Sequence, residues 1–453
     1  MALRAPRDAA IAMIGDGFGS LLVHSTAIYL GFRPEDITLF GTNPDPVGTY
    51  QRFATNLGQT VLRSESESHF LPADWPTFAQ LNAWSHRDPR YLWRSINRRY
   101  NPGVAEILTE ATVVARDLGW EACRLPRRIG WIQREETGGP WGGPHFQLYD
   151  EDAQPAGRAR HVMMGLGHGP LAFPPLLARA RENPGLAERV VHGYEPKAYH
   201  ARGRYVVIGS GIAAVNEWAN ALDAGAKVLA LTRNPIAPEQ DLNVPRCLFE
   251  ARGIDRYQQL PFDQRLRFLG DVLKGTHPRR RGWIDRVERG RAEGRFDAAV
   301  GQIDDIEPGP AGLRIHVADG GGEDLGWLDV TGVVAATGFD KSALALPLLR
   351  RMIEHYGVPV EGGRILLRSN CGVPGLDRPE SRLAMMGLTA NAVVPHGDTI
   401  AGLKYIARRF VSDAARAERL RRRAFPGRLA MQLRLTRRAA AAMRHVTATE
   451  QLA

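Results

Sequence analysis

The sequence predicts an α/β protein with two Rossmann-like, three-layer dinucleotide-binding domains. Two stretches support this fold class, Ala9–Leu30 and Arg204–Arg233, because each contains an apolar strand, a glycine-rich turn and a helical pattern in this order. A chain of 453 residues is long enough for two or more domains with ample cores. Hydrophobic residues make up 44% of it and charged residues 24%, which is the usual balance of a globular protein.

The second stretch is the better specified of the two. Its apolar runs Tyr205–Ile208 and Lys227–Leu231 are typical of buried parallel strands. Between them, Gly209–Ala214 has the pattern G-x-G-x-x-A, and Val215–Leu222 is helical. The first glycine allows a tight turn, the second lets a pyrophosphate approach the backbone, and the helix N-terminus supplies N–H groups. The predicted cofactor contacts are Gly209, Ser210, Gly211, Ile212 and Ala213.

Arg233 follows the second strand of this stretch, at the position where NAD-binding domains carry an acid for the ribose. An arginine there favours the 2′-phosphate of NADPH. The basic cluster His277–Arg281 is expected to form a solvated loop or to help hold the NADPH phosphates. A βαβ unit that uses its glycines only for packing is the alternative interpretation of the whole stretch.

The first stretch repeats the pattern less strictly. Ala9–Ile14 and Ile37–Phe40 are the expected strands, and the helical run between them ends at Gly31. The turn has glycines at positions 15, 17 and 19, and Ser20 holds the place of the last glycine of the motif. The ribose-binding acid is absent here too, because Gly41 follows the second strand. The predicted cofactor contacts are Gly15, Gly17, Phe18, Gly19 and Ser20.

The net charge of +10 has a local origin. The arginine-rich segment 408–444, whose acids are Asp413 and Glu418, accounts for the excess, so the rest of the chain is close to neutral. A general nucleic-acid role for the folded body is therefore not supported. The segment is expected to be a solvated or partly disordered tail, or a basic helix on an anionic membrane or an acidic partner.

The three cysteines, Cys123, Cys247 and Cys371, lie far apart and form no C-x-x-C. Neither a zinc ribbon nor a redox disulfide is indicated, no metal site is expected, and a reducing cytoplasm fits this usage. No apolar run reaches roughly 18 residues, so no transmembrane helix is predicted. The first predicted strand begins near Ala9, which leaves no room for a secretory signal.

A chain with two such turns resembles the two-dinucleotide-binding flavoproteins, and in particular the flavin-containing monooxygenases, over residues 8–410. Val333–Phe339 is similar to the A-T-G motif of this superfamily, and Gly165–Gly167 is a degenerate version of the same motif. The resemblance implies FAD on the first turn and NADPH on the second, with the NADPH domain inserted in a discontinuous FAD domain. The implied domains are 1–175 and 336–410 for FAD, 176–335 for NADPH, and a basic helical or flexible tail over 411–453.

The resemblance also implies further site residues. Val47–Tyr50 and Arg52–Leu57 resemble a segment that lies over the flavin, which makes Asn56 the candidate active-site amide and Arg52 a cofactor contact. A loop asparagine that caps its own backbone is the alternative interpretation of Asn56. The remaining expected cofactor contacts are Thr337, Gly338, Gly387 and Thr399.

Two departures from the family pattern are present. Lys197 replaces the histidine of the monooxygenase fingerprint within Val191–Tyr199, and Gly387-Leu388 replaces Gly-Asp. We expect an FAD-dependent, NADPH-using oxidoreductase, foremost a monooxygenase that oxidises a small organic substrate with reduced flavin and O2. The alternatives are a flavin reductase that passes electrons to a redox partner protein, and a non-catalytic dinucleotide-binding or sensing protein.

Overall fold

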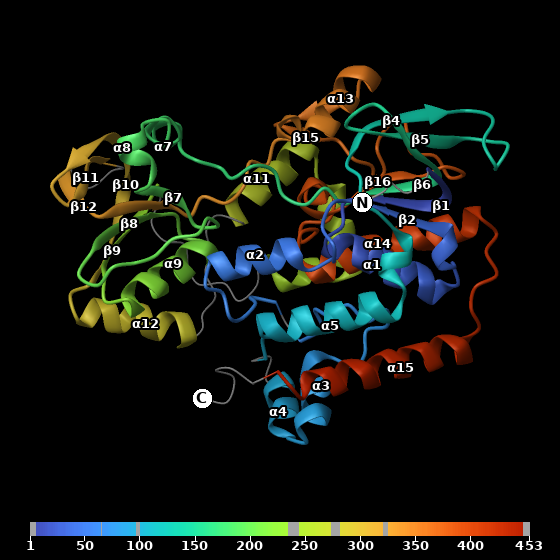
Figure 1. The fold of residues 1–453 in the computed structure, drawn as a ribbon, viewed down its shortest axis with the longest axis horizontal. Coiled ribbons are helices and arrows are strands. Elements are labelled where there is room, and N and C mark those ends of the chain that lie inside the picture. Colours follow the sequence, from blue (N-terminus) through green and yellow to red (C-terminus); the bar gives the residue numbers. More distant parts are fainter. Residues whose placement is uncertain are drawn as a thin grey trace.

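The computed structural model describes residues 6–64, 66–96, 100–233, 244–272, 281–319 and 325–446. Two sheets lie side by side, each with helices packed against it, and further helices lie below the first sheet (Figure 1). Most of the basic cluster 277–281 falls outside the described residues. Within the described ranges, no helix is both long and apolar enough to cross a membrane.

The first sheet has the strand order β3-β2-β1-β6-β5-β4, and β16 pairs with the end of β6. The strands β3, β2, β1, β6 and β16 run parallel, whereas β4, β5 and β6 form an antiparallel meander. The strand bounds are β1 Arg7–Ile14, β2 Ile37–Phe40, β3 Arg124–Leu125, β4 Ile129–Glu135, β5 His145–Asp150, β6 Pro155–Met164 and β16 Leu383–Met385.

The second sheet has the order β12-β11-β10-β9-β8-β13-β7. The strands β7, β13, β8, β9 and the first part of β10 run parallel, and β10, β11 and β12 form an antiparallel meander. All of these strands lie between β6 and β16 in the sequence, so the second sheet interrupts the first. The strand bounds are β7 Val190–His192, β8 Arg204–Ile208, β9 Lys227–Thr232, β10 Phe296–Gly309, β11 Gly312–Asp319, β12 Gly326–Val330 and β13 Gly332–Ala335.

The helices cover both sheets and fill the space around them. In the first part of the molecule, α1 packs against α14, and one core cluster joins these helices to the first sheet, α5 and α15. The helix bounds are α1 Phe18–Leu30, α2 Gly48–Asn56, α3 Phe78–His86, α4 Arg90–Ile96, α5 Val104–Asp117, α6 Trp120–Cys123, α7 Pro175–Ala180, α8 Pro184–Ala187, α9 Ile212–Asp223, α10 Ala251–Gln259, α11 Phe262–Val272, α12 Arg281–Ala292, α13 Pro347–Tyr356, α14 Ile400–Ala417 and α15 Phe425–Met443. The short elements are η1 Pro34–Asp36, η2 Arg246–Phe249, η3 Ala343–Ala345, η4 Gly387–Ala390, β14 Val360–Glu361 and β15 Arg364–Ile365.

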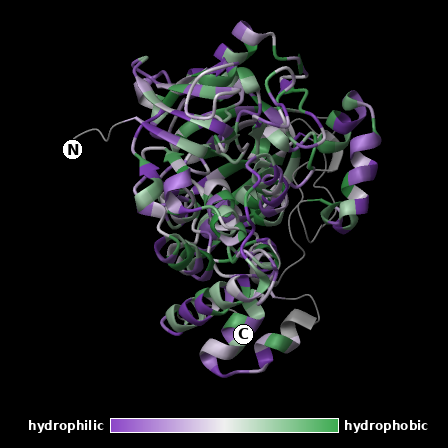
Figure 2. Ribbon diagram, turned by 90° about the vertical axis from the view of Figure 1, so that its right-hand side faces the viewer, coloured by the Kyte–Doolittle hydropathy of each residue, from purple (hydrophilic) through white to green (hydrophobic). Residues whose placement is uncertain are grey.

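The arginine-rich segment is helical and packed over its described part. α15 lies against α3 and α5 and buries Leu435, Ala439 and Met443 completely. Arg438 donates to the Asp117 carboxylate at 2.7 Å. Hydrophilic and hydrophobic residues alternate along the helices at the bottom of Figure 2, which is the pattern of helices with one buried face. A disordered tail is therefore not what the structure shows up to Val446.

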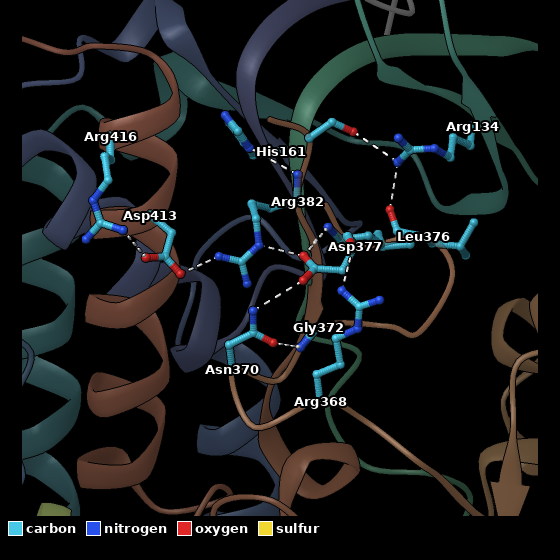
Figure 3. A network of polar contacts seen from close by, with 12 residues as sticks. Arg134, His161, Arg368, Asn370, Gly372, Leu376, Asp377, Arg382, Asp413 and Arg416 are labelled. Carbon is cyan, nitrogen blue, oxygen red and sulfur yellow. Dashed lines mark hydrogen bonds and ion pairs between the residues drawn. The ribbon is translucent and has the colours of Figure 1, made fainter. Parts of the chain in front are cut away.

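A network of buried charges fastens α14 and β16 to the first sheet (Figure 3). The Arg382 guanidinium donates to Asp377 at 2.5 Å and also to Asp413 on α14, and the side chains of Arg382 and Asp377 are 3% and 2% exposed. His161 on β6 accepts from the Arg382 backbone N–H at Nδ1, so its Nε2 carries the proton and donates to Glu418 at 3.1 Å. Burial lowers the pKa of His161, which favours this neutral form.

Replacing Arg382 by alanine is expected to lower the free energy of unfolding by about 3–5 kcal/mol, because the buried Asp377 carboxylate would lose its partner. Urea denaturation followed by circular dichroism measures this change. Arg416→Ala is the matched control, since Arg416 also pairs with Asp413 but its side chain is 75% exposed. The control should cost less than about 1 kcal/mol, and equal losses for both variants would contradict the role given to the buried network.

Candidate dinucleotide sites

The first glycine turn is tight because it lies against the end of β6. Gly15 has φ +108°, and a Cβ atom there would stand 2.0 Å from the Gly165 carbonyl oxygen. The Ser20 hydroxyl donates to the Gly15 carbonyl at 2.6 Å and closes the turn. Only glycine fits at position 15, which agrees with the motif.

The outer side of the same turn is open. Gly17 is the N-cap residue of α1, and a Cβ atom there would meet no described atom within 4 Å. No described side chain caps this helix, so its first N–H groups point into the open space. This arrangement fits a pyrophosphate group, which needs N–H donors and the positive end of a helix dipole. Phe18 presents only its backbone here, because its ring packs on Tyr50 and Phe70.

The second glycine turn repeats this construction. Gly209 has φ +122°, and a Cβ atom there would stand 2.7 Å from the Ala336 carbonyl oxygen at the end of β13. Gly211 is the N-cap residue of α9, and again no side chain among the described residues caps the helix. Ile212 and Ala213 form the first turn of α9, and Arg233 follows β9 with its side chain exposed. The predicted NADPH contacts therefore share one edge of the second sheet.

The predicted contacts Gly387 and Thr399 lie on the side of the first turn. A Cβ atom on Gly19 would stand 2.9 Å from the Met386 sulfur, so Gly387 follows directly beside α1. Thr399 is the N-cap residue of α14 and accepts from the Gly402 N–H at 3.1 Å. Thr399 therefore caps its helix, and the N-terminus of α14 lies close to the segment that follows β16.

The chain passes twice between the two sheets, and the two passages lie together. Ala172 donates from its N–H to the Gly338 carbonyl at 2.9 Å and accepts from the Thr337 hydroxyl. Gly338 has φ +76°, and a Cβ atom there would meet nothing described within 4 Å. The A-T-G motif therefore lies at the crossing, and its glycine faces open space.

Aromatic rings gather at this crossing. The Phe339 ring lies 4.2 Å from His168, 4.9 Å from Tyr194 and 5.5 Å from Phe53, measured between ring centroids. The exposed Arg52 guanidinium lies 5.4 Å from the Phe53 ring centroid. Arg52 thus lies at the junction of the two sheets, and its contact with a cofactor stays a prediction.

Asn56 bonds across the junction rather than to its own loop. Its amide donates to the Tyr194 carbonyl at 2.9 Å, and its own carbonyl accepts from Lys197 at 3.1 Å. Lys197 also pairs with Glu217 on α9 at 2.9 Å, and both side chains are buried. The sequence marks Lys197 only as a departure from a fingerprint, whereas the structure places it where α2 meets the second sheet. The flavin-facing role of Asn56 stays a prediction.

Positive charge gathers near the N-terminus of α14. Partial burial lowers the pKa of Arg364 and of Lys341, and the charge of the exposed Asp398 carboxylate opposes both shifts. Burial also lowers the pKa of His168, and the Asp398 charge opposes this shift as well. Sequence analysis did not find this group, because its members come from three distant segments.

A cavity of about 360 Å³ opens beside the same helix terminus. Its lining includes Thr399, Tyr405 and His396 from one side and Phe249 from η2 on the other. The His396 ring lies 4.4 Å from the Phe249 ring, and burial lowers its pKa to about 4, so it is neutral at physiological pH. A cavity of this size admits a small organic molecule. Its charged lining residues are Arg63, Glu67, Arg246 and Glu250.

Glu217 makes stability depend on pH. Burial raises the pKa of this carboxyl to about 7, although Lys197 and Tyr199 oppose the shift. The folded state therefore holds a proton that the unfolded state has already released, and stability falls as the pH rises from about 5 to about 7. In the Glu217→Gln variant, the part of the free energy of unfolding that wild type loses over this pH range, about 1–3 kcal/mol, should no longer be lost. Melting temperatures at pH 5 and pH 7.5 measure it, with the exposed Glu288→Gln as control. A constant difference between wild type and Glu217→Gln would contradict the assignment.

No protein-family model and no curated protein matches the sequence. Among solved structures, ornithine hydroxylase from Pseudomonas aeruginosa matches with a TM-score of 0.67 at 14% identity, over 91% of this chain and 100% of that one. L-lysine 6-monooxygenase from Pseudomonas syringae matches with 0.68 at 16% identity, over 90% and 99%. Ornithine N-hydroxylase from Kutzneria sp. 744, solved with reduced FAD, NADP+ and L-ornithine, matches with 0.68 at 16% identity, over 91% and 100%. The chain therefore shares its fold with these hydroxylases, and the predicted pair of Rossmann-like domains is confirmed.

Proposed function

We propose that this protein is an FAD-dependent, NADPH-using monooxygenase that acts on a small organic substrate. The observation that carries the proposal is the repeated construction of the two glycine turns, in which Gly17 and Gly211 each begin a helix that no described side chain caps. Solved structures with this fold include hydroxylases of ornithine and lysine. FAD would bind at Gly15–Ser20 and NADPH at Gly209–Ala213.

The residues around the first turn would hold FAD at two ends. The N–H groups of α1 face the open space above Gly17 and suit the pyrophosphate. The N-terminus of α14, capped by Thr399, would support the flavin ring, with Lys341 and Arg364 as nearby positive charges. When bound, FAD supplies the hydride and oxygen chemistry that side chains lack.

The residues at the junction would set the distance between the cofactors. Asn56 and Lys197 join the end of α2 to the second sheet, and the Phe53, Tyr194 and Phe339 rings pack around the crossing. The cavity beside His396 and Tyr405 is the substrate site that this proposal favours. All three cysteines are free; Cys123 and Cys371 are buried and Cys247 is exposed.

Several expectations stay predictions. These are the domain boundaries, the individual cofactor contacts, a cytoplasmic location, a redox partner protein, and a contact of segment 408–444 with an anionic membrane or an acidic protein. Within segment 408–444, Arg408 is the weakest candidate for a contact with a membrane or an acidic protein. Its guanidinium already pairs with Asp74 and donates to the Pro72 carbonyl.

The purified protein mixed with FAD and freed of excess cofactor is expected to keep the visible absorption bands of oxidised flavin. Anaerobic NADPH should bleach them, and air with a suitable amine or other small substrate should restore them with formation of an oxygenated product, detected by mass spectrometry. Bleaching that yields only peroxide or a reduced carrier would favour the reductase alternative. A protein that stays colourless with added FAD would favour the sensing alternative and contradict the enzyme proposal.

Arg233→Ala is expected to weaken NADPH binding about 10- to 100-fold and NADH binding little, because a charge-assisted contact to a phosphate contributes about 1.5–3 kcal/mol. Isothermal titration calorimetry with both nucleotides measures the two effects. Arg204→Ala is a matched control, since Arg204 begins β8 at the opposite end of the strand with its side chain exposed. Equal losses for NADPH and NADH would refute the role of Arg233.

A further inference from the structure

The end of β2 lacks a carboxylate in the sequence, but the structure has one at that place. Gly41 follows β2, where a dinucleotide-binding domain carries the acid for the ribose. A Cβ atom on Gly41 would stand 2.2 Å from Oδ2 of Asp16, which lies inside the first glycine turn. The Asp16 carboxylate therefore fills the space into which a side chain at position 41 would extend.

Asp16 is held firmly in this position. Its Oδ2 accepts from the Asn43 backbone N–H at 2.5 Å, and its Oδ1 accepts from the Asn43 amide at 2.6 Å. The same amide lies 3.1 Å from the Thr49 hydroxyl, and the Asn43 carbonyl accepts from Arg124 at 3.1 Å. An ionised carboxylate offers about four lone-pair sites, so these two bonds leave acceptor capacity for two more donors.

The carboxylate lies at the edge of the sheet where ligands of such folds bind. Gly15 donates from its N–H to the Phe40 carbonyl at 2.8 Å, and Gly41 donates to the Leu125 carbonyl at 3.4 Å. The carboxyl ends of β1, β2 and β3 therefore meet around Asp16. Gly17, one residue further, borders the open space that suits the pyrophosphate. An adenosine ribose attached to a pyrophosphate at Gly17 would come next to Asp16.

We propose that Asp16 receives the 2′- and 3′-hydroxyl groups of the adenosine ribose of FAD, in place of the missing acid after β2. The proposal rests on FAD binding at the first turn, as proposed above. Asp16 is 8% exposed. The competing explanation is that Asp16 only fastens the 41–49 loop through Asn43.

The test compares how tightly full-length apoprotein variants bind FAD. Quenching of the flavin fluorescence measures this binding. Asp16→Gly should weaken FAD binding about 10- to 100-fold, which is the effect of losing charge-assisted hydrogen bonds. The double variant Asp16→Gly with Gly41→Asp should recover most of this loss. It frees the space that a Cβ atom at position 41 needs, and an aspartate there can also accept from the N–H two residues on. Melting temperatures without FAD report on folding.

Asn43→Ala is the matched control for the loop. It removes one bond to Asp16 but keeps the carboxylate, so FAD binding should fall less than about threefold. Unchanged or tighter FAD binding by Asp16→Gly would overturn the proposal, because the carboxylate would then be neutral or obstructive. A loss for Asn43→Ala as large as that for Asp16→Gly, without recovery in the double variant, would also overturn it in favour of the loop explanation. Wild-type protein that binds no FAD would instead refute the proposed function.

Discussion

The structure depends on one close approach of backbone to backbone, made twice. In each domain the first glycine of the turn lies against the strand that returns through the sheet centre. Gly165 donates its N–H to the Ile14 carbonyl at 2.8 Å, and Ala336 donates to the Ile208 carbonyl at 2.9 Å. Any side chain at Gly15 or Gly209 would collide with the carbonyl of that returning segment. The helix that follows each turn begins two residues after this contact, at Gly17 and at Gly211.

The parts of the fold that could be predicted are those whose cause is local. The turns at Gly15 and Gly209 were predictable because an apolar strand, a glycine-rich turn and the start of a helix follow one another in the chain. The crossing at Thr337–Gly338 was predictable for the same reason. The structure confirms the strands and helices around these two turns within a residue or a few.

The parts that escaped prediction depend on contacts between distant residues. The sequence shows only that Gly41 is not an acid, and nothing in it indicates that Asp16 occupies the adjoining space. Asn56 was interpreted from its own segment, yet its amide bonds to Tyr194, 138 residues later. The sequence shows Lys197 only as a mismatch to the fingerprint, and its partner Glu217 lies on α9. A single sequence does not report such pairs, since spacing along the chain carries no information about them.

The docking of α2 has a mechanical consequence. Leu57, which follows this helix, is 1% exposed and belongs to the core cluster that contains Val215 and Trp218 of the second domain, and Asn220 donates to its carbonyl at 2.8 Å. Swinging the second domain away would pull this leucine out of a core, at a cost of about 1.5–3 kcal/mol for the side chain alone. Leu57 therefore anchors the end of α2 in the second domain. Any change in the spacing of the two glycine turns that moves the second domain away from α2 must first withdraw Leu57 from this core.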